Sequence, residues 1–345
     1  MAVRTPAHEE RQRRCRVPSA AGSISRHSVC GRGTAEGGGG GRRSEADRRG
    51  AEGAGTRTAT TRRRGESGAD ERGEAGVGTG RFCRRTAERT MTQNIVPIIS
   101  LRRLTAEVHE LTMAAPHIAR DARPGQFVNI RVDDHYPLLR RPFSIFAADG
   151  ERLSVVFTVI GTGTRALAAK RPGETLDVVG PCGNDFLAFE PGEYDTAVFV
   201  AGGIGVAPFP FLTRSFPANR PFVTYVGGRN SGLIVTEGLH EPHIATDDGS
   251  LGFHGTVVDL IRNETADGRF GKVRYFTCGP TRMMKALADH ARSEGSACYA
   301  SLETDMACGV GLCQGCNVER KDGPSKYALV CKEGTIFDTE QVVLR

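Results

Sequence analysis

Residues 196–216, TAVFVAGGIGVAPFPFLTRSF, join an apolar run, a cluster of glycines and a second apolar run. The first run is short, rich in β-branched and aromatic residues, and ends at the glycines, which predicts a buried strand. The residues after the glycines predict a helix. A strand, a glycine turn and a helix in this order are typical of a parallel sheet with helices on its faces.

The same alternation continues towards the C-terminus. The sequence predicts strands at 221–228 (PFVTYVGG) and 272–280 (KVRYFTCGP), and helices at 255–263 (GTVVDLIRN) and 281–295 (TRMMKALADHARSEG). We therefore expect an α/β domain over residues 193–295.

Upstream of this domain, residues 91–192 predict a different architecture. Runs such as QFVNIRV (126–132) and LSVVFTVI (153–160) are rich in β-branched residues, and Pro and Gly breaks separate them. This pattern favours a small antiparallel β-barrel.

Downstream, residues 296–345 contain four cysteines with the spacing C-x4-C-x2-C-x14-C. This is the plant-type [2Fe-2S] spacing, whereas zinc sites more often pair C-x2-C units. Gly309, Gly311 and Gly315 allow the loop to wrap closely around a cluster. We predict a [2Fe-2S] site, with structural zinc as the alternative. The predicted ligands are Cys308, Cys313, Cys316 and Cys331.

Three stretches contain candidate nucleotide-binding residues. The backbone N–H groups around Gly202, Gly203 and Gly205 can receive a pyrophosphate at a helix start. The pattern is not the G-x-G-x-x-G fingerprint, and glycine turns also serve packing. Cys278 ends a predicted strand, where it is either the neighbour of a redox ring or a small core residue.

The third stretch lies in the barrel segment, where RRPFSI (140–145) precedes VIGTGTRAL (159–167). Arg141 can pair with a phosphate, and the Ser144 hydroxyl can bond to a ring edge. The alternative is that Arg141 is an ordinary surface arginine.

The net charge of +6 is unevenly distributed. Residues 1–90 hold 20 Arg, 11 acidic residues and almost no apolar periodicity, so we predict a disordered extension. Residues 91–345 hold 26 basic and 29 acidic residues, which gives no reason to expect a nucleic-acid partner. No apolar run is long enough for a membrane span or a signal peptide. We therefore expect a cytoplasmic protein, whose clustered thiols indicate metal or redox chemistry.

The order of the motifs resembles one family. RPFS (141–144), GTGT (161–164), GGIGVAP (202–208) and CGP (278–280) are arranged as in ferredoxin-reductase-type modules for flavin and pyridine nucleotide. With SLETDMACGVGLCQGC (301–316) appended, residues 95–345 resemble the electron transfer subunit of bacterial NAD-dependent dihydroorotate dehydrogenase. The resemblance implies a multidomain β plus α/β fold: an FAD-binding barrel, an NAD-binding α/β domain and a small C-terminal [2Fe-2S] module.

The resemblance also implies site residues. FAD would contact Arg141, Pro142, Phe143 and Ser144, then Val156, Phe157 and Thr158 along the flavin, and Gly163 and Thr164 at the pyrophosphate. NAD would contact Gly202, Gly203, Gly205, Cys278, Gly279 and Pro280. Asp247 and Asp248 favour NAD over NADP, because carboxylates suit ribose hydroxyls and repel a 2′-phosphate.

The resemblance further implies a partner, an FMN-containing catalytic subunit, in a heterotetramer with two copies of each chain. Electrons would pass from the partner's FMN through the cluster and FAD to NAD⁺ in pyrimidine biosynthesis, with no catalytic residue for dihydroorotate in this chain. Reductase subunits of sulfide dehydrogenases or electron-bifurcating transhydrogenases are the enzymatic alternative. A zinc-holding scaffold is the non-enzymatic one.

Overall fold

The computed structural model describes residues 91–266 and 268–345. The predicted disordered extension, residues 1–90, lies outside the described residues.

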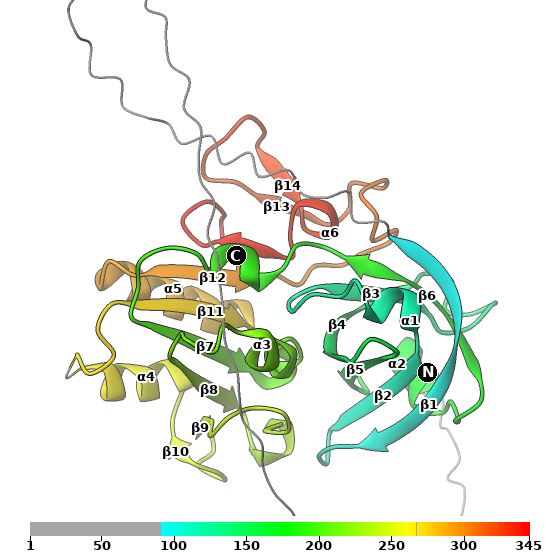
Figure 1. Cartoon of the computed structure of the whole chain (residues 1–345), viewed down its shortest axis with the longest axis horizontal. Coiled ribbons are helices and arrows are strands. Elements are labelled where there is room, and N and C mark those ends of the chain that lie inside the picture. Colours follow the sequence, from blue (N-terminus) through cyan, green and yellow to red (C-terminus); the bar gives the residue numbers. More distant parts are fainter. Residues whose placement is uncertain (1–90, 267) are drawn as a thin grey trace, which may run out of the picture. The chain divides into compact units, whose positions relative to one another are not determined.

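The N-terminal part of the described chain is a closed antiparallel barrel with the strand order β1-β2-β5-β4-β3-β6 (Figure 1). Its strands are β1 (Thr92–Arg103), β2 (Val108–Ala114), β3 (Phe127–Arg131), β4 (Arg141–Ala148), β5 (Arg152–Thr158) and β6 (Thr175–Cys182). Two short helices, α1 (Pro116–Ala119) and α2 (Thr162–Ala168), lie in the connections. The predicted barrel is confirmed.

Strand β3 shows how the barrel connects to the rest of the chain. Side chains alternate between the two faces of a strand. Val128 and Ile130 belong to the barrel core, whereas Phe127 belongs to a different core that also contains Cys316 and Cys331. The outer face of β3 is therefore covered by the cysteine-bearing segment.

The second unit of structure is a seven-stranded sheet with the order β10-β9-β8-β7-β11-β12-β15. Its strands are β7 (Thr196–Gly202), β8 (Phe222–Gly228), β9 (His243–Thr246), β10 (Phe253–His254), β11 (Val273–Cys278), β12 (Ala297–Ser301) and β15 (Ile336–Asp338). All neighbouring pairs are parallel except β12 and β15.

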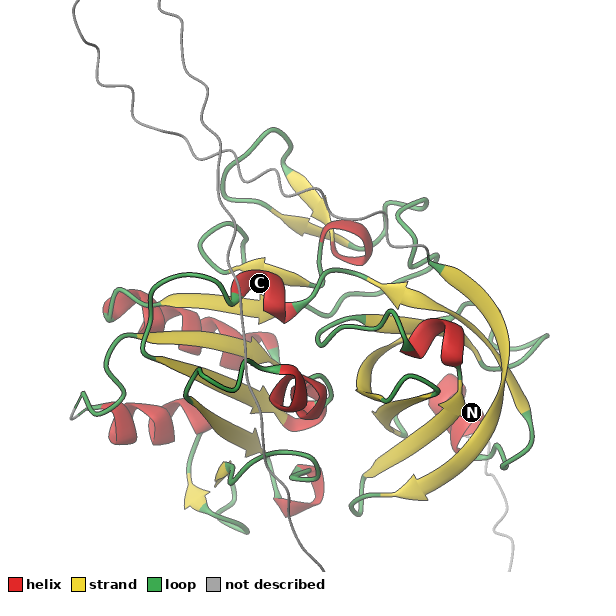
Figure 2. Cartoon of the chain, in the orientation of Figure 1, coloured by secondary structure: helices red, strands yellow, loops and turns green. Residues whose placement is uncertain are grey.

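Helices cover both faces of this sheet (Figure 2). Val198 and Val200 pack with α4 (Val257–Thr265) and α5 (Thr281–Ser293), while Phe199 packs on the other face with α3 (Phe209–Ser215). The Thr256 hydroxyl caps α4 by accepting a hydrogen bond from the Asp259 N–H at 3.2 Å. The predicted strands and helices of the α/β domain are all present.

The short helical turns are η1 (Phe186–Phe189), η2 (Gly203–Val206) and η3 (Ser231–Leu233). The cysteine-bearing segment adds a hairpin of β13 (Asn317–Glu319) and β14 (Tyr327–Leu329), followed by α6 (Val330–Glu333). Strands β12 and β15 flank this segment and belong to the seven-stranded sheet, although both lie within residues 296–345. Residues 296–345 therefore contribute to the sheet as well as to the cysteine loop.

Among the helices of the described residues, none has the length and apolar character needed to cross a membrane.

Candidate functional site

A cavity of about 740 Å³ lies between the barrel, the glycine turn after β7 and the segment that leads into the cysteine loop. Strands β4 and β5 are antiparallel neighbours, so the start of β4 and the end of β5 lie at the same end of the barrel. Eight predicted site residues line the cavity: Arg141, Pro142, Phe143, Ser144, Val156, Phe157, Thr158 and Thr164.

Arg141 is the cation in this wall. Its Nη1 donates to the Leu139 carbonyl at 2.7 Å, and no carboxylate among the described residues forms an ion pair with it. The preceding arginine, Arg140, is instead paired with Asp177 at 2.6 Å. Arg141 therefore carries a charge that is available to an anionic ligand, whereas the charge of Arg140 is paired with Asp177.

The turn before α2 packs against Arg141. A Cβ at Gly163 would lie 3.2 Å from Arg141 Nε, so glycine gives the guanidinium room. The Thr164 hydroxyl accepts hydrogen bonds from the N–H groups of Ile160 and Gly161, at 3.0 and 3.1 Å. Its structural contribution is thus to hold the turn, while its surface faces the cavity. Gly163 does not line the cavity.

The glycine turn after β7 packs backbone to backbone against the end of β11. A Cβ at Gly205 would lie 2.6 Å from Gly279 Cα, and a Cβ at Gly279 would lie 2.9 Å from Gly202 Cα. A side chain at these positions would separate the two turns. At Gly203, which has a φ of +54°, a Cβ would meet no atom within 4 Å, so this position stays open to an approaching ligand.

The predicted NAD residues are thus brought together, but they lie beside the cavity rather than in its wall. Of the turn after β7, Ile204 and Ala207 line the cavity. Cys278 is almost fully buried. Burial raises the pKa of its thiol, and the nearby Glu303 carboxylate raises it further, so the group is a neutral thiol.

The cysteine loop points backbone donors at sulfur. Cys308 Sγ accepts from the N–H groups of Val310 and Cys313, each at 3.4 Å, and Cys331 Sγ accepts from the Gly311 N–H at 3.1 Å. Cys316 Sγ lies 3.1 Å from Cys331 Sγ. Gly309 and Gly311 have φ of +67° and +83°, which glycine adopts without strain.

These contacts alter the acidity of the thiols. Burial disfavours the Cys308 thiolate, but hydrogen bonds from Cys313 and Val310 outweigh it and lower the pKa of Cys308 to about 6. Burial and the adjacent Cys316 raise the pKa of Cys331 to about 12. Within residues 91–266 and 268–345, no three His, Cys, Asp or Glu side chains are gathered closely enough to hold a metal ion. The loop has the donor chemistry of a cluster site, but its four sulfurs are not drawn together as ligands.

Comparisons with known proteins bear directly on this combination of barrel, sheet and cysteine loop. Residues 303–343 match the family model of the iron-sulfur cluster binding domain of dihydroorotate dehydrogenase B. The dihydroorotate dehydrogenase B (NAD(+)) electron transfer subunit of Enterococcus faecalis is 35% identical over 261 residues, 73% of this chain and 98% of that protein. The subunit of the same name from Desulforamulus reducens is 37% identical over 256 residues, 71% of this chain and 96% of that protein.

The chain belongs to this family. Its named members are electron transfer subunits of an oxidoreductase, as predicted from the sequence. Membership therefore favours the predicted function over the sulfide dehydrogenase and transhydrogenase alternatives.

Solved structures support the fold. A structure of an NADH-dependent reduced ferredoxin-NADP oxidoreductase is 28% identical, with a TM-score of 0.63 over 73% of this chain and 90% of that chain. A ferredoxin NADP⁺ reductase from Neisseria gonorrhoeae has a TM-score of 0.50 over 63% of this chain and 95% of that chain. At 16% identity the latter shows the fold alone, which is the predicted ferredoxin-reductase type.

In this member of the dihydroorotate dehydrogenase electron transfer family, one wall of the cavity was not predicted from the sequence. Residues 301–307 line the cavity opposite the barrel. Glu303 is one of these lining residues, and partial desolvation raises the pKa of its carboxyl. Its position directly before the cysteine loop, in SLETDMACG, is the only sequence signal that could have drawn attention to it.

The two acids expected near a nucleotide ribose do not line the cavity. Asp247 and Asp248 are exposed residues just after β9, where the Asp247 N–H donates to the Gly228 carbonyl at 3.0 Å. Hydrogen bonds from Ser250 lower the pKa of Asp248. The Asp248 N–H donates to the Arg229 carbonyl at 3.2 Å.

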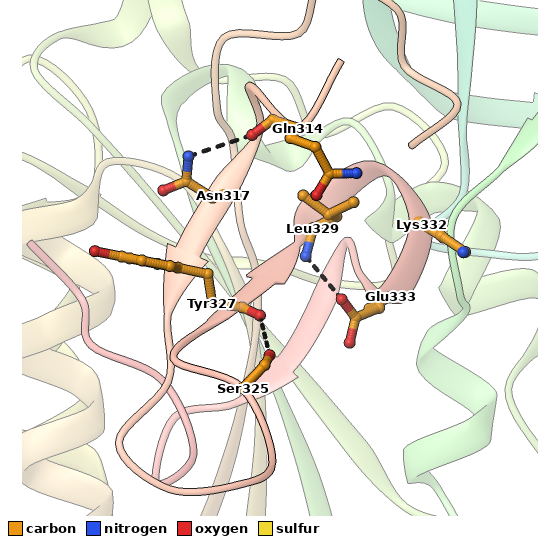
Figure 3. Close-up of a pocket in the computed structure, with 7 residues that line it drawn as sticks. All are labelled: Gln314, Asn317, Ser325, Tyr327, Leu329, Lys332 and Glu333. Atoms are coloured by element: carbon orange, nitrogen blue, oxygen red, sulfur yellow. Dashed lines mark hydrogen bonds between the residues drawn. The ribbon is translucent and has the colours of Figure 1, made fainter. Parts of the chain in front are cut away.

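A second, open pocket of about 650 Å³ lies on the cysteine-bearing segment (Figure 3). Three hydrogen bonds shape it: Ser325 Oγ to the Tyr327 carbonyl at 2.6 Å, the Leu329 N–H to Glu333 Oε1 at 2.9 Å, and Asn317 Nδ2 to the Gln314 carbonyl at 3.4 Å. Lys332 completes a mixed-charge lining.

Proposed function

We propose that this chain carries electrons between the FMN-containing catalytic subunit of a dihydroorotate dehydrogenase and NAD⁺, using FAD and a [2Fe-2S] cluster. One observation carries the proposal. A single cavity is bounded on one side by the Arg141–Ser144 strand and on the other by Ala307 and Gly315 of the cysteine loop. A cofactor in the barrel cavity would therefore be a neighbour of the loop.

When bound, FAD exchanges a hydride for single electrons and the cluster carries one electron at a time, which suits a path between NAD and a partner protein. The chain's own residues bind and orient these groups. Arg141 would pair with the FAD phosphates, because its guanidinium has no carboxylate partner among the described residues. Pro142, Phe143, Ser144, Val156, Phe157 and Thr158 would form the wall for the flavin, and Gly163 and Thr164 would form the turn beside Arg141.

For the cluster, we propose Cys308, Cys313, Cys316 and Cys331 as the ligands. The N–H groups of Val310, Gly311 and Cys313 already point at sulfur, and such donors stabilise negative charge on a cluster.

For the nicotinamide nucleotide, we propose Gly202, Gly203 and Gly205 together with Cys278, Gly279 and Pro280. The space beside Gly203 would allow a phosphate to approach the backbone, and the close packing of Gly205 on Gly279 holds this turn in position. We propose NAD rather than NADP on account of Asp247 and Asp248. Comparable NADH and NADPH turnover would contradict this preference.

The partner contact is proposed at the tip of the cysteine loop. Leu312, between Cys308 and Cys313, is a large apolar side chain within the cysteine loop itself and is 81% exposed. Gln314, two residues further along the loop, lines the open pocket in Figure 3. We propose that the catalytic subunit covers Leu312, and that two copies of each chain assemble. We place the complex in the cytoplasm, where reduced thiols persist.

The test uses the chain with and without the FMN-bearing subunit. Alone, it should pass electrons from NADH to an artificial dye but show no dihydroorotate-dependent reduction of NAD⁺. Adding the catalytic subunit should restore that reaction. Leu312→Glu should lower the coupled reaction about tenfold or more and leave the dye reaction intact. Ile95→Glu, which alters an exposed apolar residue of β1, is the control. Oxidation of dihydroorotate by the isolated chain would contradict the proposal.

A further inference from the structure

One buried polar residue of the barrel reaches the cysteine loop. Asn129 lies in the middle of β3 and has no solvent exposure. Its neighbours Val128 and Ile130 fill the barrel core, so alternation directs Asn129 outwards, to the face that the cysteine-bearing segment covers. Asparagine is costly to bury unless it has hydrogen-bond partners, and here it sits where an apolar residue would pack more simply.

The amide contacts the backbone of the first cluster cysteine. Asn129 Nδ2 donates to the Cys308 carbonyl at 3.2 Å, a contact between residues 179 positions apart. A Cβ at Gly309 would overlap the same amide. A glycine is therefore needed at this position both because its φ is +67° and because a side chain would displace Asn129. The next two N–H donors along the loop that reach Cys308 Sγ belong to Val310 and Cys313.

The amide oxygen of Asn129 is an unused hydrogen-bond acceptor among the described residues. This atom, Oδ1, is buried and finds no partner among the described residues. A buried amide oxygen without a partner is uncommon in a folded protein.

We propose that Asn129 is a positioning residue for the cysteine loop: its amide fixes the peptide of Cys308 against the barrel and so aims the Val310 and Cys313 N–H groups at Cys308 sulfur. This rests on the proposed function, because its consequence is a change in the reduction of the cluster. Donors to sulfur stabilise the more negative, reduced form. Losing their alignment makes the cluster harder to reduce.

The chain supplies a matched control at a second contact between the barrel and this segment. Asn184, just after β6, holds the Ile336 backbone through both amide atoms, with Oδ1 accepting at 2.9 Å and Nδ2 donating at 2.8 Å. The hydrogen bonds of its side chain within the described part of the chain go to Ile336 and the Glu333 carbonyl, which lie outside the Cys308–Cys316 loop. Asn184→Ala therefore removes a comparable tie without altering the cluster loop.

The experiment compares Asn129→Leu, Asn129→Ala and Asn184→Ala with the unaltered chain by reductive titration, followed by electron paramagnetic resonance of the cluster. Leucine has the same branched side-chain shape as asparagine, so it leaves no room for a water molecule in place of the amide. Both Asn129 variants should lower the ratio of reduced to oxidised cluster at a fixed potential about fivefold, the scale of one lost hydrogen bond. The resonance line shape should change as well. Asn184→Ala should lower the thermal stability but leave the ratio and line shape unchanged.

The outcomes separate the two proposals. Unchanged reduction and line shape in both Asn129 variants, or the same shift in Asn184→Ala, would overturn the positioning role. Loss of iron with FAD retained in both Asn129 variants would support it in a stronger form. Absence of iron from the unaltered chain would instead contradict the proposed function.

Discussion

The barrel end of the cavity and the cysteine loop are built by opposite means. In the barrel, side chains from β4 and β5 meet because antiparallel register places Arg141–Ser144 beside Val156–Thr158. In the loop, the backbone supplies the contacts: N–H groups point at sulfur, and Gly309 and Gly311 take positive φ. The barrel site therefore depends on the identity of its side chains, and the loop depends on its cysteines and on its backbone conformation. The difference predicts which variants remove which cofactor.

The largest effect should follow from breaking the loop alone. Cys313→Ser should remove or distort the cluster, because thiolate ligands are required, and should leave FAD bound in the barrel. Iron, sulfide and flavin analysis of the purified variant measures this. Cys182→Ala, a buried cysteine of β6 outside the loop, should retain both cofactors. Parallel loss of iron and FAD in Cys313→Ser would show that the two sites are not separate.

A second variant tests the packing of glycine on glycine in the α/β unit. Gly205→Ala places a methyl against the Cys278 and Gly279 backbone, which must shift. We expect a loss of stability of about 1–3 kcal/mol and at least tenfold slower flavin reduction by NADH. Gly203→Ala has φ +54° but no atom within 4 Å of the added methyl, so it should destabilise by only about 1 kcal/mol. Equal effects of the two substitutions would remove the packing argument.

The third variant breaks the barrel side while sparing the loop. Arg141→Ala should weaken FAD binding about tenfold to a hundredfold, as for loss of a charge-assisted hydrogen bond, and leave the iron content unchanged. Flavin retention during gel filtration and fluorescence titration with FAD measure this. Arg152→Ala, at the exposed start of β5, should bind FAD normally. Normal FAD affinity of Arg141→Ala would make that arginine structural.

The smallest effect concerns the barrel behind the cavity. His109 in β2 stacks on Phe157 with a 5.6 Å centroid separation, and its Nδ1 is buried without a partner among the described residues. Burial, and then Arg103, lower the pKa of His109 below its usual value near 6.5. The unfolded chain therefore takes up the proton first as the pH falls, and stability is lost below about pH 6.5.

His109→Gln should reduce the loss of stability at low pH. We expect the difference in Tm between pH 5 and pH 8 to become smaller in the variant than in the unaltered chain, by at most roughly 3 °C. Thermal unfolding at both pH values measures it. An unchanged pH profile in the variant would assign the acid sensitivity to another group.

The sequence predicted the parts of the molecule that are local. The four cysteines lie within 24 residues of one another, and β7, β8, β11, α4 and α5 each carry their own apolar pattern. The cavity wall at 301–307 could not be predicted, because it faces a barrel strand that is about 150 residues away in the chain. Strand β15 is three residues long and gains its place only by pairing with β12.

Asn129 shows the same limit from the other side. Within QFVNIRV it looks like an ordinary polar position of an alternating strand, expected to face solvent. It is instead fully buried, because residues near 308 cover that face of β3. Polar residues buried by a distant segment leave no local pattern, so only the folded chain identifies them.

The most direct test of this electron path is an anaerobic titration of the purified chain, without its partner, with NADH. We predict about one FAD and two irons per chain, bleaching of the flavin absorbance, and the resonance signal of a reduced cluster developing with it. Cys313→Ser should bleach without that signal. Flavin bleaching without any cluster signal in the unaltered, iron-loaded chain would contradict the claim that the barrel cavity and the cysteine loop form one electron path.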